Sequence, residues 1–149
     1  MKIVTCLVIA GLFLTATTYA QQPRPKTIRP GAPIMGLTGS VADGQLIYKK
    51  YCLTCHQADG GGVPRMNPPL IKTSYVLGDK ARIIKIVLNG FSEQVDIDGD
   101  YYSNAMPAFD FLKDKEVADV LTYVRNSFTN KAPAVKVAEV TRLRVKKKI

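Results

Sequence analysis

Two cysteines and the only histidine of the chain stand together in the string Cys52-Leu53-Thr54-Cys55-His56. A C-x-x-C-H spacing is the attachment signature of a c-type haem, because each thiol can form a thioether with a haem vinyl group while the adjacent imidazole reaches the iron. The alternatives are a redox-active dithiol, half of a zinc site, or coincidence. Thioredoxin-like C-x-x-C motifs occur in a βαβ pattern, which this sequence lacks, and a zinc site needs two more ligands. The motif therefore predicts one covalently attached haem c, with His56 as a ligand of its iron.

A second protein ligand of the iron cannot be an imidazole, since His56 is the only histidine. The remaining options are a methionine, a lysine, water or an open site. Met35 lies in a proline-rich stretch, and Met66 follows His56 by only ten residues, in a loop that must still pass around the haem edge. Met106 follows His56 by fifty residues, in a proline-containing loop between two expected helices. Met106 is the predicted second ligand, and Met66 is the alternative.

The periodicity around these residues predicts a small all-α domain of three to four helices around the haem. Ser40 can cap a helix over 41–52, which would deliver the thiols and the imidazole together. A second helix is expected over 79–89, before a glycine that acts as a stop signal. An Asp-Gly pair predicts a turn or small hairpin over 95–99. The last strong helix is expected over 114–128, with a capping glutamate in its first turn.

The 149 residues are expected to form a single domain with an extension on each side. Residues 1–20 combine one lysine, an apolar run and small residues before a cleavage site, which is typical of a signal peptide. An uncleaved membrane anchor is the alternative, although the apolar run is shorter than the ~20 residues that a membrane span needs. Residues 21–37 are rich in proline and predict an extended linker. The haem domain covers 38–130, and 131–149 form a basic C-terminal extension with a short, weak helix.

The net charge of +9 is concentrated at the ends of the chain. Residues 38–130 hold ten Lys and Arg against eleven Asp and Glu, whereas 131–149 hold seven basic residues against Glu139. This distribution argues against nucleic-acid binding by the predicted haem domain at 38–130. The basic end is either simply solvated or docks on an acidic partner or an anionic membrane surface.

The order of these motifs resembles that of class I monohaem cytochromes c over residues 38–130. The shared elements are the C-x-x-C-H motif, a glycine-rich loop, Pro-Pro-Leu at 68–70, Asn-Ala-Met-Pro at 104–107, and Asp-Val-Leu-Thr-Tyr-Val-Arg at 119–125. In that family a proline carbonyl accepts a hydrogen bond from the proximal histidine, which implies this role for Pro68, with Pro69 as its neighbour. The family also has a close crossing of the first and last helices, which implies a contact between Gly44 and Tyr123.

The strings at 123–127 and 138–140 resemble, more narrowly, haem domains attached to or partnered with quinoprotein dehydrogenases and some nitrite reductases. We therefore expect a periplasmic or secreted one-electron carrier of a respiratory chain, rather than an enzyme. Its partners would be a dehydrogenase or quinol-oxidising donor and a terminal oxidase or reductase. The alternatives are a haem enzyme or gas-binding protein with an open sixth site, and a module in which the haem only supports the fold.

Overall fold

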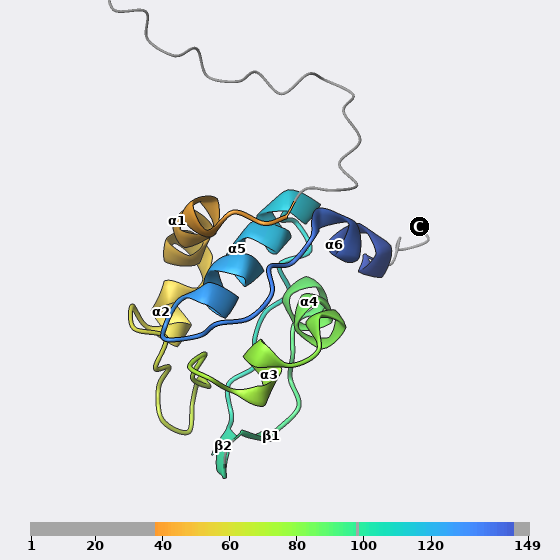
Figure 1. Cartoon of the computed structure of the whole chain (residues 1–149). Coiled ribbons are helices and arrows are strands. Elements are labelled where there is room, and N and C mark those ends of the chain that lie inside the picture. Colours follow the sequence, from red (N-terminus) through yellow and green to blue (C-terminus); the bar gives the residue numbers. More distant parts are fainter. Residues whose placement is uncertain (1–37, 98, 145–149) are drawn as a thin grey trace, which may run out of the picture. The chain divides into compact units, whose positions relative to one another are not determined.

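The computed structural model describes residues 38–97 and 99–144. The predicted signal peptide, the predicted linker and the last five residues lie outside this part. The described residues are mainly helical, as predicted, with one small hairpin (Figure 1). The elements follow one another as α1 (Val41–Tyr51), α2 (Leu53–His56), α3 (Ser74–Leu77), α4 (Lys80–Asn89), β1 (Val95–Ile97), β2 (Asp100–Tyr102), α5 (Asp114–Asn126) and α6 (Val137–Leu143).

Helix α1 begins where the sequence predicts. Ser40 is in an extended conformation, and its hydroxyl accepts a hydrogen bond from the N–H of Asp43 at 3.2 Å. Asp43 in the first turn and the two lysines in the last turn also complement the helix dipole. The helix ends at Tyr51, one residue before its predicted end, and Cys52 leads into α2.

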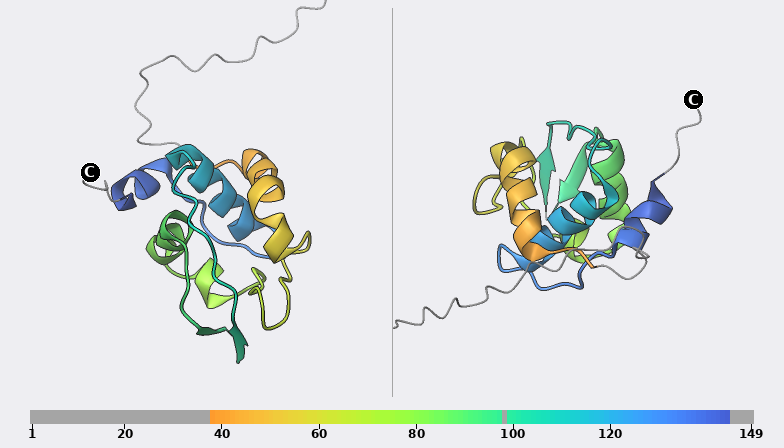
Figure 2. Two further views of the ribbon diagram at one scale, coloured as in Figure 1. Left: turned by 180° about the vertical axis from the view of Figure 1, so that it is seen from behind. Right: turned by 90° about the horizontal axis from the view of Figure 1, so that it is seen from above.

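Helices α1 and α5 lie side by side in all views (Figures 1 and 2). Their backbones approach closely because α1 has Gly44 at the crossing. A Cβ atom added at Gly44 would lie 2.1 Å from the carbonyl oxygen of Asp119 and 2.7 Å from the Cβ of Tyr123. One turn further along α1, the buried ring of Tyr48 packs against the ring of Tyr123, with 5.3 Å between their centroids. The crossing therefore fixes the end of α1 that leads into the cysteines.

Helix α5 ends two residues before its predicted end at 128. Its start agrees with the prediction, since the N–H of Lys113 donates to the carboxylate of Glu116 at 2.8 Å. At the other end Ser127 is extended, and the next two residues have φ values of 53° and 64°, which a right-handed helix does not allow. The buried side chain of Asn130 replaces the missing turn, because its Nδ2 donates to the carbonyl of Val124 at 2.8 Å.

The middle of the chain contains one predicted helix, the predicted hairpin and one helical turn that was not predicted. Helix α4 is capped by Asp79 and ends before Gly90, as expected. Strands β1 and β2 pair in antiparallel fashion and confirm the hairpin. The additional turn is α3, where the buried Thr73 accepts a hydrogen bond from the N–H of Val76 at 3.3 Å. A Thr-Ser pair before apolar residues is a recognisable helix start, but four residues are too few for a periodic signal.

Residues of the predicted C-terminal extension form the short helix α6, which packs against α5 and α4. The N–H of Gly39 donates to the carbonyl of Val135 at 2.8 Å, so the start of the described chain is bonded to the segment that leads into α6. Lys80 of α4 forms a 2.8 Å ion pair with Glu139, and the side chain of Arg144 forms a 2.6 Å ion pair with Asp114. Helix α6 is thus held from both α4 and the start of α5.

The contact at Gly44 predicts a large cost for the smallest possible side chain. In Gly44→Ala the new methyl group would meet backbone atoms of α5, which cannot move without separating the helices. We expect the free energy of unfolding to fall by about 2–3 kcal/mol, measured by urea denaturation of the haem-loaded protein. Gly61→Ala is the control, since its methyl group would meet only the flexible carboxylate of Asp59 at 3.1 Å. Equal stability of the two variants would contradict the close crossing.

The ion pair of α6 predicts a pH-dependent contribution to stability. Burial raises the pKa of Glu139, but the N–H of Lys136 and the ammonium of Lys80 lower it by more, so the net pKa in the folded protein is lowered. Such a carboxylate stabilises the fold above its unfolded pKa of about 4.3, and this contribution is lost as the pH falls through the lower folded value. Glu139→Gln should therefore lower the free energy of unfolding by about 1 kcal/mol at pH 7.

The difference in free energy of unfolding between Glu139→Gln and the original protein should shrink as the pH falls below about 4. The measurement is urea unfolding at pH 7 and below about pH 4. Glu116→Gln is the matched variant, because Glu116 accepts the corresponding backbone hydrogen bond in α5. The amide oxygen of glutamine can keep that bond, so this variant reports the loss of a capping charge without the ion pair to Lys80. A deficit that does not change with pH would exclude the proposed contribution of the Glu139 charge.

Candidate haem-binding site

The two cysteines and the histidine lie at the junction of α1 and α2. Cys52 follows the last residue of α1, and Cys55 and His56 belong to the single turn of α2. The N–H of His56 closes this turn by donating to the carbonyl of Cys52 at 2.9 Å. Neither thiol forms a disulfide, and burial together with the nearby Cys55 raises the pKa of Cys52 to about 11. One turn of the backbone thus presents two thiols and one imidazole.

The ring of His56 is buried, with 9% of its surface exposed, and is fixed by Pro68. Its Nδ1 atom lies 3.0 Å from the carbonyl oxygen of Pro68. A carbonyl only accepts, so Nδ1 carries the proton and Nε2 keeps a lone pair for a metal ion. Burial lowers the pKa of His56, and the contact with Pro68 raises it only in part, which keeps the ring neutral at pH 7. Pro68 is the proline that the resemblance implies.

The loop after His56 folds back sharply toward the ring. Gln57 ends α2 with a φ of 63°, and its carbonyl accepts a 2.6 Å hydrogen bond from the hydroxyl of Tyr48 in α1. Gly62 has a φ of 68°, and a Cβ atom there would lie 2.3 Å from the carbonyl oxygen of Asn67. Only glycine fits this close return of the chain. The glycine-rich loop therefore brings Pro68 beside His56.

A large apolar cleft opens next to this turn. It has a volume of about 1280 Å³, including the part open to solvent, and Cys52, Cys55 and His56 all line it. Helices α4 and α5 and the segment 104–109 supply other walls. Most of the lining is aliphatic or aromatic, including Ile83, Val87, Phe109, Leu112, Leu121 and Val124. Such a cleft excludes water from a large flat ligand while leaving the exposed Cys55 at its edge.

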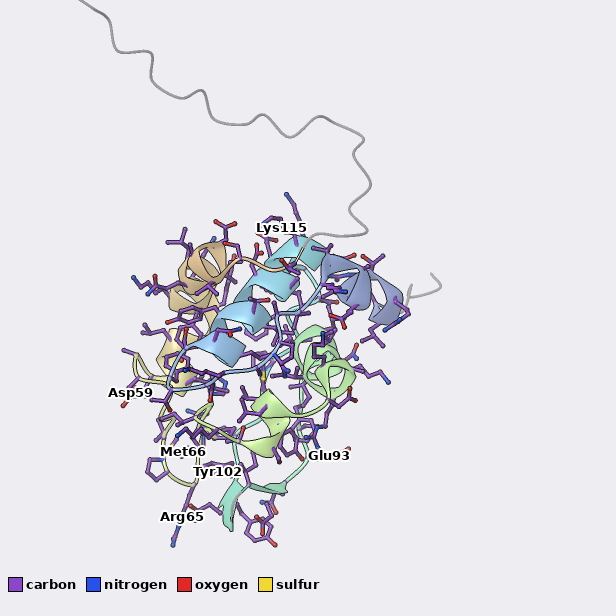
Figure 3. The ribbon with its side chains drawn as sticks, in the orientation of Figure 1. Asp59, Arg65, Met66, Glu93, Tyr102 and Lys115 are labelled. Carbon is purple, nitrogen blue, oxygen red and sulfur yellow. The ribbon has the colours of Figure 1, made fainter. Side chains whose placement is uncertain are left out.

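Met106 also lines the cleft, whereas Met66 does not. The backbone of Met106 pairs with Phe91, two residues after the end of α4, through hydrogen bonds of 2.7 Å and 2.9 Å. Met66 is 48% exposed and lies in the turn at 63–67, beside Arg65, whose side chain points away from the domain (Figure 3). Met35 lies outside the described residues. Of the methionines described by the structure, Met106 is the one that shares a cleft with His56.

The residues of the cleft fit a covalently attached haem. Two thiols, a neutral imidazole with a free Nε2 and a methionine sulfur all face an apolar space, and this is the donor set that holds a c-type haem. The alternatives of the sequence analysis find less support. The C-x-x-C motif follows a helix and is not part of a βαβ unit. Among residues 38–97 and 99–144, no three His, Cys, Asp or Glu side chains gather as a metal site.

Several polar groups that organise the cleft were not predicted from the sequence. Arg125, with 2% of its surface exposed, donates to the carbonyls of Val76, Gly78 and Pro133 and so anchors the chain around α3. Asn67 and Asn104 line the cleft edge and bond to each other. Their positions gave a weak signal, since Asn67 precedes Pro68 and Asn104 stands two residues before Met106. Hydrogen bonding between distant loops cannot be read from a single sequence.

Comparison with known proteins agrees with this geometry. The family model described as cytochrome c matches residues 41–128. Cytochrome c-552 of Thermus thermophilus is 35% identical over 122 residues, which cover 75% of this chain and 81% of that protein. The cytochrome c subunit of alcohol dehydrogenase (quinone) from Gluconacetobacter polyoxogenes is 34% identical over 123 residues, 79% of this chain and 26% of that subunit. The cytochrome c subunit of gluconate 2-dehydrogenase from Pantoea cypripedii is 33% identical over 99 residues, 64% of this chain and 22% of that subunit.

No helix in the part of the chain that the structure describes is long and apolar enough to cross a membrane.

The apolar cleft predicts that the fold depends on its ligand. In the double variant Cys52→Ala, Cys55→Ala the haem is no longer held covalently, and the aliphatic walls of the cleft would face water. We expect the free energy of unfolding to fall by roughly 3 kcal/mol or more, or about 12 °C or more in Tm. The measurement is thermal unfolding followed by circular dichroism. Each single variant keeps one thiol and should have an intermediate Tm. A haem-free protein with the original Tm would contradict the prediction.

Proposed function

The chain belongs to the cytochrome c family, and on this basis we propose that it is an extracytoplasmic one-electron carrier with a single His/Met-ligated haem c. The observation that supports this most is the shared apolar cleft of Cys52, Cys55, His56 and Met106. In this proposal the two cysteines hold the haem covalently, and His56 and Met106 are the two ligands of its iron. When bound, the haem supplies reversible one-electron chemistry, and a methionine ligand favours a higher reduction potential than a second histidine would.

The protein's own residues would each have a distinct task in this carrier. The carbonyl of Pro68 holds the proton on Nδ1 of His56 and so fixes the orientation and the basicity of the ring. The backbone pairing with Phe91 fixes Met106. The apolar walls exclude water, so that little has to reorganise when the charge of the site changes. The contact between Gly44 and α5 fixes the helix that leads into the first cysteine.

The proposed partners are redox proteins. The relatives include cytochrome c subunits of dehydrogenases, and on this likeness we propose a dehydrogenase or quinol-oxidising donor and a terminal oxidase or reductase as acceptor. Export to the periplasm by residues 1–20 is part of this proposal, as is docking of the basic tail on an acidic partner or membrane surface. Residues 1–20 and the last five residues of the tail lie outside the described part of the chain.

The ligand assignment can be tested with two methionine variants. In Met106→Ala the ferric protein should lose the charge-transfer band of a methionine–iron bond at the red end of the spectrum, and the reduction potential should fall, because the sulfur ligand is gone. Met66→Ala is the matched control and should keep both properties. The measurements are an optical spectrum and a redox titration of the haem-loaded proteins. A high-spin spectrum of the original protein would instead favour the alternative of an open sixth site in a haem enzyme or gas-binding protein.

A further inference from the structure

Two loops that belong to different sides of the cleft are joined by four hydrogen bonds. The turn at 63–67 follows His56, and residues 103 and 104 precede Met106. The N–H groups of Ser103 and Asn104 donate to the carbonyls of Arg65 and Met66 at 3.1 Å and 3.0 Å. The hydroxyl of Ser103 also donates to the Arg65 carbonyl at 3.1 Å, and Nδ2 of Asn104 donates to Oδ1 of Asn67 at 3.1 Å. We call this set of contacts the loop clasp.

On one side the loop clasp is connected to His56 through short covalent and hydrogen-bonded steps. The turn itself is closed by the backbone pairing of Val63 with Asn67. Asn67 is followed directly by Pro68, whose carbonyl holds Nδ1 of His56. The N–H of Gly62 donates in addition to the carbonyl of His56 at 3.1 Å. A displacement of the turn at 63–67 would therefore also displace the imidazole ring of His56.

On the other side the loop clasp ends two residues from Met106. Only Ala105 separates Asn104 from Met106, whose own backbone is bonded to Phe91. Met106 is thus held by α4 through Phe91 and by the turn at 63–67 through Asn104. Ala105 and Pro107, which flank it, are exposed. Because these flanking residues add little burial, the bonded neighbours must keep the segment against the cleft.

We propose that Asn67 and Asn104 are positioning residues that keep Met106 on the iron by tying its segment to the loop beside His56. This inference rests on the proposed role of Met106 as ligand and adds to it the groups that maintain that ligand. The side chains of Asn67 and Asn104 touch none of the reacting atoms in this role. They act by limiting how far the segment around Met106 can move away from the cleft.

The test measures how readily an external ligand replaces Met106 in the ferric, haem-loaded protein. Imidazole is titrated into the protein while the charge-transfer band of the methionine–iron bond is followed. Loss of one hydrogen bond in Asn104→Ala should favour the detached segment and raise the apparent affinity for imidazole roughly fivefold. Asn67→Ala should have the same effect. The double variant should bind imidazole no more tightly than either single variant, because each substitution removes the same hydrogen bond.

Two further variants separate positioning from a general loss of stability. Asn67→Asp keeps an acceptor for Nδ2 of Asn104 and should restore the original affinity for imidazole. Asn126→Ala removes a comparable 2.9 Å hydrogen bond, from Nδ2 to the carbonyl of Thr122 in α5, and should leave that affinity unchanged. If Asn104→Ala leaves the imidazole affinity unchanged, or if Asn126→Ala raises it equally, the positioning role is wrong. If the original protein lacks the band altogether, the assignment of Met106 as ligand fails instead.

Discussion

At Gly44 the backbone of α1 lies against the carbonyl of Asp119 in α5, and this contact sets the position of the whole C-x-x-C-H segment. Because α2 follows α1 without a connecting loop, the crossing angle of the helices decides where the thiols and His56 face. The same two helices line the cleft through Tyr51 and Leu121. A larger separation of α1 and α5 would therefore displace Cys52, Cys55 and His56. It would also open the apolar cleft that these helices line. The site is in this sense a consequence of helix packing.

Once the helices are placed, buried polar groups determine how the loops close around the cleft. Arg125 and Asn130 are both buried, and they donate to three carbonyls that lie outside the helices and strands, those of Leu70, Gly78 and Pro133. Within residues 38–97 and 99–144, every buried side-chain nitrogen and oxygen has a hydrogen-bond partner. An unpaired buried donor would cost about 1–3 kcal/mol, so such side chains specify one loop arrangement rather than several. The apolar core alone would not distinguish between them.

Most helix boundaries could be predicted because their signals are local. Ser40, Asp79 and the Asp-Gly pair each act on neighbouring residues, so caps, stops and the hairpin could be placed from the sequence. The end of α5 could not, since it depends on Asn130, which reaches back into the helix from outside it. The prediction of Met106 over Met66 used the number of residues that separate each from His56 and the proline-containing loop around Met106. The backbone pairing that holds Met106 could not have been identified in that way. Contacts between distant loops need the fold to be known first.

One charge of the basic C-terminal extension contributes directly to the fold. Arg144 not only pairs with Asp114 but also donates to the carbonyls of Asp110 and Leu112, each at 2.6 Å. Those carbonyls belong to the segment that connects Met106 to α5. The segment is therefore held at three places: before Met106 by the loop clasp, at Met106 by its backbone pairing, and at 110–112 by the extension. Part of the basicity of residues 131–149 thus stabilises the methionine side of the cleft.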